Sequence, residues 1–420
     1  MQPLRISGLA NANLQNKINI SGIFNYIREQ GPTYRARIAK DLNCSAPAVS
    51  RAIERLMGDG YIVETTKIVT GSGKRPTQLR INPEKGFVIG IDLIKERIKI
   101  AVSDFSGQVT GNYQGFSFDE DIDVCRKLVE NIDGVLARLG GPPSSAGTKN
   151  LRAIGIGVPA IIDIQTGAVI DAPLYKNLRG INLKNEMEKR YGVPVFVENV
   201  VKLSALGEKQ CGEGKNFKDV VFIEISDGIG AGIILDNHLV RGYYGSAGEI
   251  GFSIIGADHL GFVIRNKGFL EKNASIKSIK ESAVEALAKG EWRGVSETVV
   301  DGLTPSSVCE AAYSGEEAPK GILDRIVRYL AVEIINLILT LNPQIVVIGG
   351  DFCSLPHVQE LFIDPITGYV KGCLPFEAPK IKLSGLGEDA GIVGATFFAI
   401  NSFLLNEFPY TVSRKMAIVG

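Results

Sequence analysis

The fold is decided by residues 193–202, which read Val193-Pro194-Val195-Phe196-Val197-Glu198-Asn199-Val200-Val201-Lys202. The apolar first half follows a glycine and predicts a buried strand, and a helix is predicted from Lys202 to Gln210. Polar side chains at the end of a buried strand destabilise the fold unless they meet partners or a ligand. In open α/β sheets, ligands bind in crevices at the carboxyl ends of the strands. We therefore expect Glu198 and Asn199 to lie beside a ligand-binding cleft.

Predicted strands on either side of this stretch repeat in the same order. Before it come three strands, a helix and a fourth strand, at residues 87–92, 98–104, 109–116, 122–139 and 153–158. After it come three short strands, helical material, two more strands and a closing helix, at residues 219–225, 230–235, 239–242, 321–341, 344–348, 381–386 and 390–405. This order is typical of a ribonuclease-H-like half. The sequence therefore predicts an α/β protein with a two-lobed, actin-like body of the sugar kinase and hsp70 type.

A separate domain is predicted for residues 1–83, ahead of a first lobe at residues 84–205 with about 388–420 and a second lobe at residues 206–387. Apolar residues at helical spacing predict three helices, at residues 18–30, at residues 35–42 and from Ser45 onward. Two strand-like pieces, residues 61–63 and 78–81, flank the basic segment 71–76. Three helices and a two-stranded wing make a winged helix-turn-helix, whose third helix enters the major groove of DNA.

Charge is unevenly distributed along the chain. Residues 1–83 contain 12 Lys or Arg and 5 Asp or Glu, a net +7, and the remaining 34 basic and 41 acidic residues give −7. A basic domain on an acidic body favours a nucleic acid partner, here operator duplex DNA. The candidate DNA contacts are Ser45, Ala46, Pro47, Ser50, Arg51 and Arg55 of the third helix, and Lys74 and Arg75 of the wing. A small helical protein-binding module is the alternative, and Arg55 is equally compatible with a solvated surface charge.

The composition is ordinary for a globular protein of 420 residues, with 45% hydrophobic and 22% charged residues. No uninterrupted apolar run approaches the length of a membrane span, and the N-terminus lacks the apolar segment of a signal peptide. The six cysteines are scattered, which indicates a reducing compartment and no cysteine-built metal site. We therefore expect a cytoplasmic protein without a membrane segment.

Glycine-rich and polar motifs recur in order along the chain. They are Gly155-Ile156-Gly157-Val158-Pro159, Pro173-Leu174-Tyr175-Lys176-Asn177-Leu178, Glu198-Asn199, Gly228-Ile229-Gly230-Ala231-Gly232, Gly245-Ser246-Ala247-Gly248-Glu249-Ile250-Gly251, Leu270-Glu271 with Ala274-Ser275, and Val347-Ile348-Gly349-Gly350. In these motifs the chain resembles the ROK family (repressors, open reading frames, kinases). The additional N-terminal domain resembles the repressor branch of that family, whose members often sense sugars.

Departures from the family pattern argue against catalysis. Family kinases carry a catalytic aspartate directly after the Glu-Asn pair, where this chain has Val200, which cannot accept a proton. In the first phosphate loop Ile94 and Glu96 replace residues of an Asp-x-Gly-x-Thr motif, and Asp227 lies in the second. Carboxylates facing a triphosphate repel it. The resemblance therefore implies no catalytic residue, no nucleotide cofactor and no kinase activity.

The zinc segment of the family is also absent. Phe252 replaces the histidine that contacts both sugar and zinc in the family, and residues 258–269 contain no cysteine. We therefore expect no metal site. Together with Val200, Phe252 is expected to make the ligand pocket more apolar than in the kinases.

The polar residues that remain form the expected effector site, namely Asn177, Asn199, Glu249 and Glu271. Carboxylates and amides each accept or donate two hydrogen bonds, which suits a polyhydroxy ligand such as a sugar or cyclitol. The alternative is that Glu249 and Glu271 only tie loops together. We interpret the chain as a sugar- or cyclitol-responsive repressor of carbohydrate-utilisation genes that acts as a homodimer or higher homo-oligomer. Two other readings are a sugar kinase with a fused DNA-binding domain and a regulator that senses a protein partner.

Overall fold

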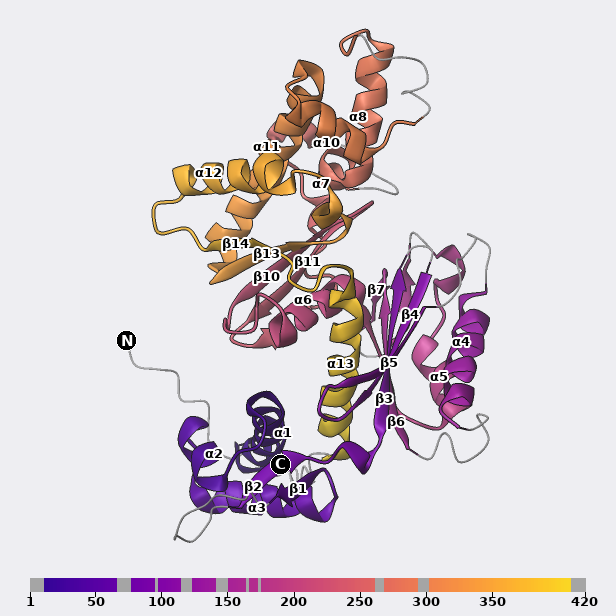
Figure 1. Ribbon diagram of the computed structural model, residues 1–420, viewed down its shortest axis with the longest axis vertical. Helices are drawn as coiled ribbons and strands as arrows, with labels where there is room; N and C mark the ends of the chain where they lie inside the picture. Colours follow the sequence, from indigo (N-terminus) through magenta and orange to yellow (C-terminus); the bar gives the residue numbers. More distant parts are fainter. Residues whose placement is uncertain are drawn as a thin grey trace, which may run out of the picture.

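The computed structural model describes residues 11–65, 77–94, 97–114, 123–140, 150–163, 166–172, 175–260, 268–293 and 302–408. Figure 1 shows three groups of elements, an N-terminal group and two lobes that each contain a β-sheet. Lys74, Arg75 and Glu96 lie outside the described residues.

The N-terminal group consists of three helices and a small sheet. The helices are α1 (Asn11–Gln30), α2 (Arg35–Asp41) and α3 (Ala46–Gly58), and the strands are β1 (Ile62–Thr65) and β2 (Gln78–Ile81). The strands pair antiparallel, with Ile62 opposite Ile81. In α3 the apolar residues Val49, Ile53 and Leu56 fall on one face and are buried. The helix α1 begins seven residues before the predicted Ile18.

The first lobe contains a mixed five-stranded sheet in the order β5-β4-β3-β6-β9. Its strands are β3 (Phe87–Ile94), β4 (Arg97–Asp104), β5 (Val109–Gln114), β6 (Leu151–Val158) and β9 (Val195–Asn199). The first three are antiparallel neighbours, and β3, β6 and β9 run parallel. Apolar residues of α4 (Val124–Arg138) and α5 (Leu183–Tyr191) form one core with this sheet.

The second lobe repeats this topology in the order β12-β11-β10-β13-β14. Its strands are β10 (Val220–Ile225), β11 (Ile229–Leu235), β12 (His238–Leu239), β13 (Ile345–Gly349) and β14 (Lys380–Leu383). The strand β12 is shorter than predicted, since the chain turns at Gly242, which has a φ of 73°.

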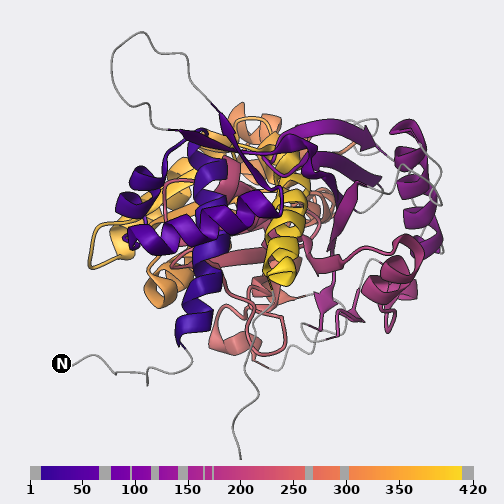
Figure 2. The same cartoon turned by 90° about the horizontal axis from the view of Figure 1, so that it is seen from below.

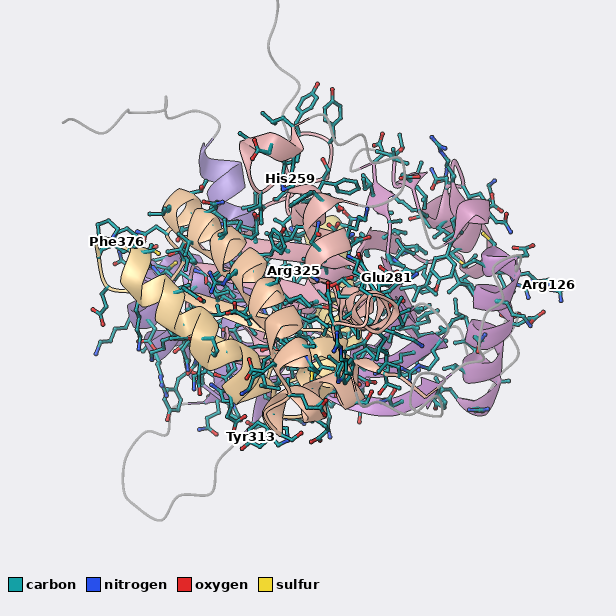
Figure 3. The ribbon with its side chains drawn as sticks, turned by 90° about the horizontal axis from the view of Figure 1, so that it is seen from above. Arg126, His259, Glu281, Tyr313, Arg325 and Phe376 are labelled. Atoms are coloured by element: carbon teal, nitrogen blue, oxygen red, sulfur yellow. The ribbon has the colours of Figure 1, made fainter. Side chains whose placement is uncertain are left out.

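A helical layer covers one face of the second sheet. It contains α7 (Phe269–Ala274), α8 (Ile276–Ala288), α10 (Pro305–Tyr313), α11 (Glu317–Leu341) and α12 (Asp364–Cys373). Figure 3 looks onto this layer, with Arg325 and Glu281 near its middle, and Arg325 Nη2 of α11 donates to Ser282 Oγ of α8 at 2.9 Å.

Two helices lie between the sheets. The helix α6 (Val200–Cys211) packs on β10 and β11, and α13 (Ala390–Glu407) packs on β3 and β6. The two helices cross in close contact, because a Cβ added at Gly207 would collide with the carbonyl oxygen of Ala390 and one at Gly394 with that of Leu203. Among the described helices, the segment Gly387–Glu407 has the length and apolar character of a membrane span, but most of its apolar stretch is buried inside the protein.

The N-terminal group shares a core with the end of α13 and the first lobe. Buried Phe24 and Tyr61 pack with Phe105, Phe403 and Phe408, and the ring centroids of Tyr61 and Phe105 lie 5.5 Å apart. Figure 2 shows α1 and α3 beside the lower end of α13. The N-terminal group is therefore packed against the body and not only joined to it at Pro83.

Candidate functional site

Asn199 lies between the last strand of the first sheet and the first turn of α6. Its Oδ1 accepts hydrogen bonds from the backbone N–H groups of Val201 at 2.9 Å and Lys202 at 3.3 Å, so it caps the helix. Its Nδ2 donates to the carbonyl oxygen of Ala160 at 3.1 Å. This cap starts α6 at Val200 and not at the predicted Lys202. One amide hydrogen of Asn199 is left for a ligand.

Glu198 also meets protein partners. Its Oε1 accepts from the backbone N–H of Asn199 at 2.9 Å, and its Oε2 pairs with Arg241 Nε at 2.6 Å. Arg241 follows β12 of the second lobe, so the ion pair joins the two lobes. The polar pair at the strand end is thus satisfied within the protein, as its burial requires.

Lys202 is a site residue that the sequence analysis missed. It is 1% exposed, and its Nζ donates to the carbonyl oxygen of Gly245 at 2.8 Å. Burial lowers the pKa of Lys202, and the nearby carboxylates of Glu198 and Glu249 oppose that shift. The feature of the sequence that could have identified Lys202 is the position of a lysine within the apolar stripe of a predicted helix. Lys202 ties α6 to the loop that carries Glu249.

Glu249 and Glu271 lie on neighbouring segments of the second lobe. Burial raises the pKa of Glu249, against the effect of Lys202. Glu271 is on α7. A Cβ atom added at Gly228 would lie 3.1 Å from Glu271 Oε2, and one added at Gly251 would lie 3.4 Å from it. The carboxylate of Glu271 therefore lies between the turn that follows β10 and the loop of Glu249.

Asn177 is the fourth predicted effector residue. It is exposed on a short 3₁₀ turn of the first lobe, Lys176–Leu178. The adjoining Tyr175 donates from its hydroxyl to the carbonyl oxygen of Ile94 at 2.8 Å, which holds this segment near the end of β3. Of the four predicted effector residues, the structure links Asn199, Glu249 and Glu271 through Lys202 and the loop of Gly245 to Gly251, and it shows no such link for Asn177 among the described residues.

Phe252 is 52% exposed on the second lobe. Its part in an apolar ligand pocket stays a prediction. Val200 is half-buried at the first position of α6. Within the described residues there is no group of three or more His, Cys, Asp or Glu side chains that could hold a metal ion.

A second polar group lies deeper, where the sheets of the two lobes face each other. Burial raises the pKa of Asp92 on β3 to about 7, and Lys99 opposes this shift. Burial also raises the pKa of Glu224 on β10 to about 8, and the charges of Asp92 and Asp351 add to it. Asp92 Oδ1 has no hydrogen-bond partner among the described residues. Both carboxyls are therefore partly protonated at neutral pH, and only their ionised forms disfavour a nearby anion.

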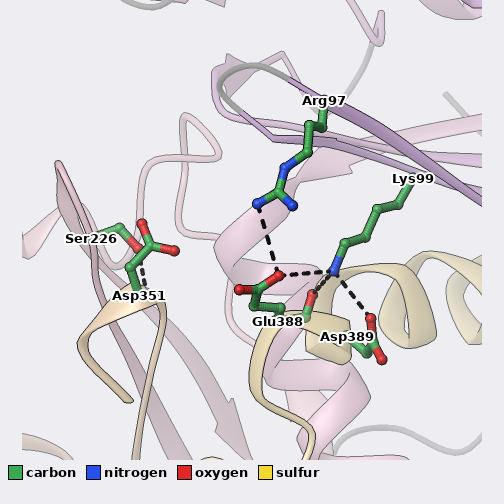
Figure 4. A network of polar contacts seen from close by, with 6 residues as sticks. All are labelled: Arg97, Lys99, Ser226, Asp351, Glu388 and Asp389. Atoms are coloured by element: carbon green, nitrogen blue, oxygen red, sulfur yellow. Dashed lines mark hydrogen bonds and ion pairs between the residues drawn. The ribbon is translucent and has the colours of Figure 1, made fainter. Parts of the chain in front are cut away.

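Lys99 holds the start of α13 to the first sheet (Figure 4). Its Nζ donates to the carbonyl oxygen of Glu388 at 2.9 Å and to Asp389 Oδ1 at 3.1 Å, and lies 3.5 Å from Glu388 Oε2. Across from it, the backbone N–H of Asp351 donates to Ser226 Oγ at 3.0 Å. The cation neutralises part of the acidic charge between the lobes.

Most of the candidate DNA contacts on α3 lie at its start, and Arg55 lies in its last turn. Ser45, Ala46, Pro47 and Arg51 are exposed and Ser50 is half-buried. Ser45 occupies the cap position, but its hydroxyl makes no capping hydrogen bond. Arg55 is exposed, pairs with Asp59 at 3.7 Å and lies 5.2 Å from the ring centroid of Phe408.

The fold and this site define a two-lobed protein of the sugar kinase type with a further helical N-terminal group. The chain belongs to the ROK family, whose model matches residues 88–402. The chain is 30% identical over 402 residues to the xylose repressor of Caldicellulosiruptor bescii, covering 94% of this chain and 98% of that protein. It is 26% identical over 337 residues to the DNA-binding transcriptional repressor Mlc of Escherichia coli, covering 79% of this chain and 80% of that protein.

Solved structures agree with this assignment. The crystal structure of a ROK family transcriptional regulator, a homologue of E. coli Mlc, superposes with a TM-score of 0.76 and 25% identity, covering 93% of this chain and 96% of that one. A ROK family glucokinase from Streptomyces griseus, in complex with glucose and AMPPNP, has a TM-score of 0.59 and 27% identity over 75% of this chain and 99% of its own. The predicted family and actin-like fold are therefore confirmed.

Proposed function

We propose that this protein is a DNA-binding transcriptional repressor that responds to a sugar or cyclitol bound between its two lobes. The observation that carries the proposal is the length of the match to relatives named as xylose repressors. It covers 94% of this chain and therefore includes most of the N-terminal group as well as the sugar kinase body. Regulation of carbohydrate-utilisation genes and a cytoplasmic location follow from the same proposal.

The N-terminal group is proposed to read operator DNA as a winged helix-turn-helix. Three helices and an antiparallel pair of strands have the composition of that motif, with α3 as the recognition helix. The exposed start of α3 supports this role, and the unused hydroxyl of Ser45 is available for a phosphate or base contact. Lys74 and Arg75 are proposed to contact the DNA backbone from the wing. Arg55 is the least suited of the candidates, since its charge is engaged by Asp59.

The effector is proposed to bind against Asn199, Glu249 and Glu271, with Asn177 approaching from the first lobe. The support is the shared neighbourhood of the first three residues and their capacity to bind several hydroxyl groups. A ligand that touches both lobes favours their closed arrangement, which supplies the differential affinity that an effector needs. Because several relatives are named as xylose repressors, D-xylose is the first compound to test.

The deciding experiment combines effector and operator binding. A panel of pentoses, hexoses and cyclitols is screened for thermal stabilisation of the full chain, since specific binding to the folded state raises apparent stability. The stabilising compound is then titrated into the protein with and without operator DNA. We expect the compound to change operator affinity, and we expect Glu249→Gln and Glu271→Gln to weaken its binding. Unchanged affinity in both variants would place the effector elsewhere.

Two further measurements separate the alternatives. Arg51→Ala is expected to cost roughly 1–3 kcal/mol of operator binding and to relax base preference, whereas Lys74→Ala should weaken all sequences alike. A protein-binding module would show neither effect. Robust ATP-dependent phosphorylation of any sugar on the panel would favour a kinase, whose general base alone is typically worth about 10²–10⁴-fold in rate.

A further inference from the structure

A single cation of the N-terminal group contacts both of the helices that lie between the lobes. Arg28, in the last turn of α1, donates from Nη1 to Asn401 Oδ1 of α13 at 3.1 Å and from Nη2 to Gln210 Oε1 of α6 at 3.4 Å. Its guanidinium also lies 4.6 Å from the ring centroid of Phe397 on α13. Arg28 is separated in sequence from Asn401 by 373 residues and from Gln210 by 182 residues.

The environment of Arg28 makes these contacts sensitive to geometry. Burial lowers the pKa of Arg28 to about 10, so the side chain stays cationic at neutral pH. Its Nε is buried without a hydrogen-bond partner among the described residues. Among the described residues both of its side-chain acceptors are neutral amides, and desolvating a cation is destabilising unless its hydrogen bonds are made. Arg28 as a whole is half-buried, so the contact is most favourable while Gln210 and Asn401 are both in place.

Other parts of α6 and α13 lie at the candidate effector site. The helix α6 begins at the cap residue Asn199 and carries Lys202, and it ends next to Gln210, about 15 Å away at 1.5 Å per residue. On α13, Phe398 lies 5.9 Å from the guanidinium of Arg241, which is the residue that pairs with Glu198. The adjoining Phe397 faces Arg28.

Because α6 and α13 cross, a movement of the lobes would also move the side-chain amides of Gln210 and Asn401. The helices belong to different lobes and pass each other at Gly207 and Gly394 with little space between their backbones. Tightly packed helices shift as rigid units. A rotation about this crossing would change the separation of Gln210, in the last turn of α6, and Asn401, in the second half of α13.

We propose that Arg28 is the residue through which effector binding is coupled to the DNA-binding domain. The guanidinium bridges α6 and α13 only at one crossing geometry, and a ligand that moves the lobes breaks or makes that bridge. This inference rests on the proposed function, and it adds the residue and the contact that carry the signal. The aromatic contacts of Phe24, Tyr61, Phe105 and Phe403 hold the N-terminal group in place independently of Arg28.

The test measures coupling, defined as the ratio of effector affinities in the presence and absence of operator DNA. Wild type is expected to show a ratio of about 5 to 150, the usual range of allosteric coupling. In Arg28→Met, which keeps the apolar length of the side chain and removes the charge, we expect the ratio to fall to about 1 to 2. Both separate affinities, for effector alone and for operator alone, are expected to stay within about threefold of wild type, because Arg28 belongs to neither proposed binding surface.

Three variants refine the result. Gln210→Leu and Asn401→Leu each remove one acceptor and are expected to reduce the ratio by a similar factor, and adding either change to Arg28→Met is expected to have no further effect. Arg126→Met, on the outer face of α4, is the matched control and should keep the wild-type ratio. Full coupling in Arg28→Met would overturn the inference. Operator binding that no effector alters in wild type would instead contradict the proposed function, and with it this inference.

Discussion

Asp92 and Glu224 illustrate how single side chains set the chemistry between the lobes. They occupy matching strands of the two sheets, β3 and β10, where Asp92 is buried and Glu224 is partly exposed. Loss of solvation raises the pKa of both carboxyls, and the charge of Asp92 raises the pKa of Glu224 further, because two negative charges in a poorly solvated space repel. Both carboxyls are therefore partly protonated at neutral pH in this protein.

These shifted pKa values predict a pH dependence of stability. In the unfolded chain both carboxyls ionise near pH 4, whereas folding raises the pKa of Asp92 to about 7 and that of Glu224 to about 8. Between about pH 4 and pH 8 the folded state holds protons that the unfolded state has released, so the free energy of unfolding falls as the pH rises. Asp92→Asn is expected to lessen that fall and to be more stable than wild type at pH 8 by at least about 1 kcal/mol.

Urea denaturation at pH 5 and pH 8 measures this effect. The exposed Glu130, whose pKa is lowered by Lys127, supplies the control, and Glu130→Gln should leave the difference between the two pH values close to that of wild type. An unchanged pH dependence in Asp92→Asn would mean that this carboxyl is ionised in the folded protein.

Asn199 gives a second prediction at this scale. Asn199→Ala removes the cap of α6 and should lower the free energy of unfolding by about 0.5–2 kcal/mol. Asn199→Asp keeps the acceptor for Val201 and Lys202 but loses the donor to Ala160, so it should retain more of the stability. Thermal denaturation of the three proteins tests the ranking, and equal losses in both variants would exclude the capping role.

At the scale of elements, the crossing of α6 and α13 is the feature on which the two lobes depend. The sheets do not pair with each other, and the two helices form the most extensive contact between elements in the described structure. Side chains larger than hydrogen at Gly207 and Gly394 would force the backbones apart. The glycines therefore fix the distance between the lobes at the hinge.

Gly394→Ala tests this close packing. Alanine favours the helix more than glycine does, but its Cβ would disturb the contact between the two helices. Alanine stabilises an exposed helix interior by about 0.5–1 kcal/mol relative to glycine, and we expect that gain at Gly134→Ala on α4, where an added Cβ meets nothing within 4 Å. Gly394→Ala should instead destabilise by about 1–3 kcal/mol, because its Cβ collides with the carbonyl oxygen of Leu203. A stabilised Gly394→Ala protein in denaturant unfolding would show that the helices can separate without loss.

At the scale of the whole molecule, we expect a homodimer on DNA. One recognition helix contacts few base pairs, and two half-sites related by symmetry supply the selectivity that a genome requires. Sedimentation of the protein alone and with operator DNA should show two chains for each operator. A single chain in both samples would contradict this prediction, and scrambling one half-site should weaken binding if it holds.

Much of the secondary structure and the family could be read from the residues alone. Apolar runs and periodic stripes depend only on neighbours in sequence, so they placed the strands of the two large sheets and the helices α4, α6, α11 and α13 within a few residues. No ranges were predicted for α5, α7, α8, α10 and α12. The motif order was sufficient for the ROK family, and Val200 after Asn199 was sufficient to question catalysis. The role of Glu198 as an inter-lobe partner and the bond from the Asn199 amide to Ala160 could not be read, because Arg241 and Ala160 are distant in sequence. The cap that Asn199 makes for α6 is local, since Asn199 accepts from Val201 and Lys202.

The tertiary structure decided which of these pieces meet. It buried Lys202 against Gly245 and exposed both Phe252 and Asn177. It also joined Arg28 of the first domain to Asn401 near the end of the chain, a contact that no local pattern indicates. Hydrophobic periodicity states which side of an element is buried, but it does not name the partner that buries it. That choice depends on packing and hydrogen bonds between residues hundreds of positions apart.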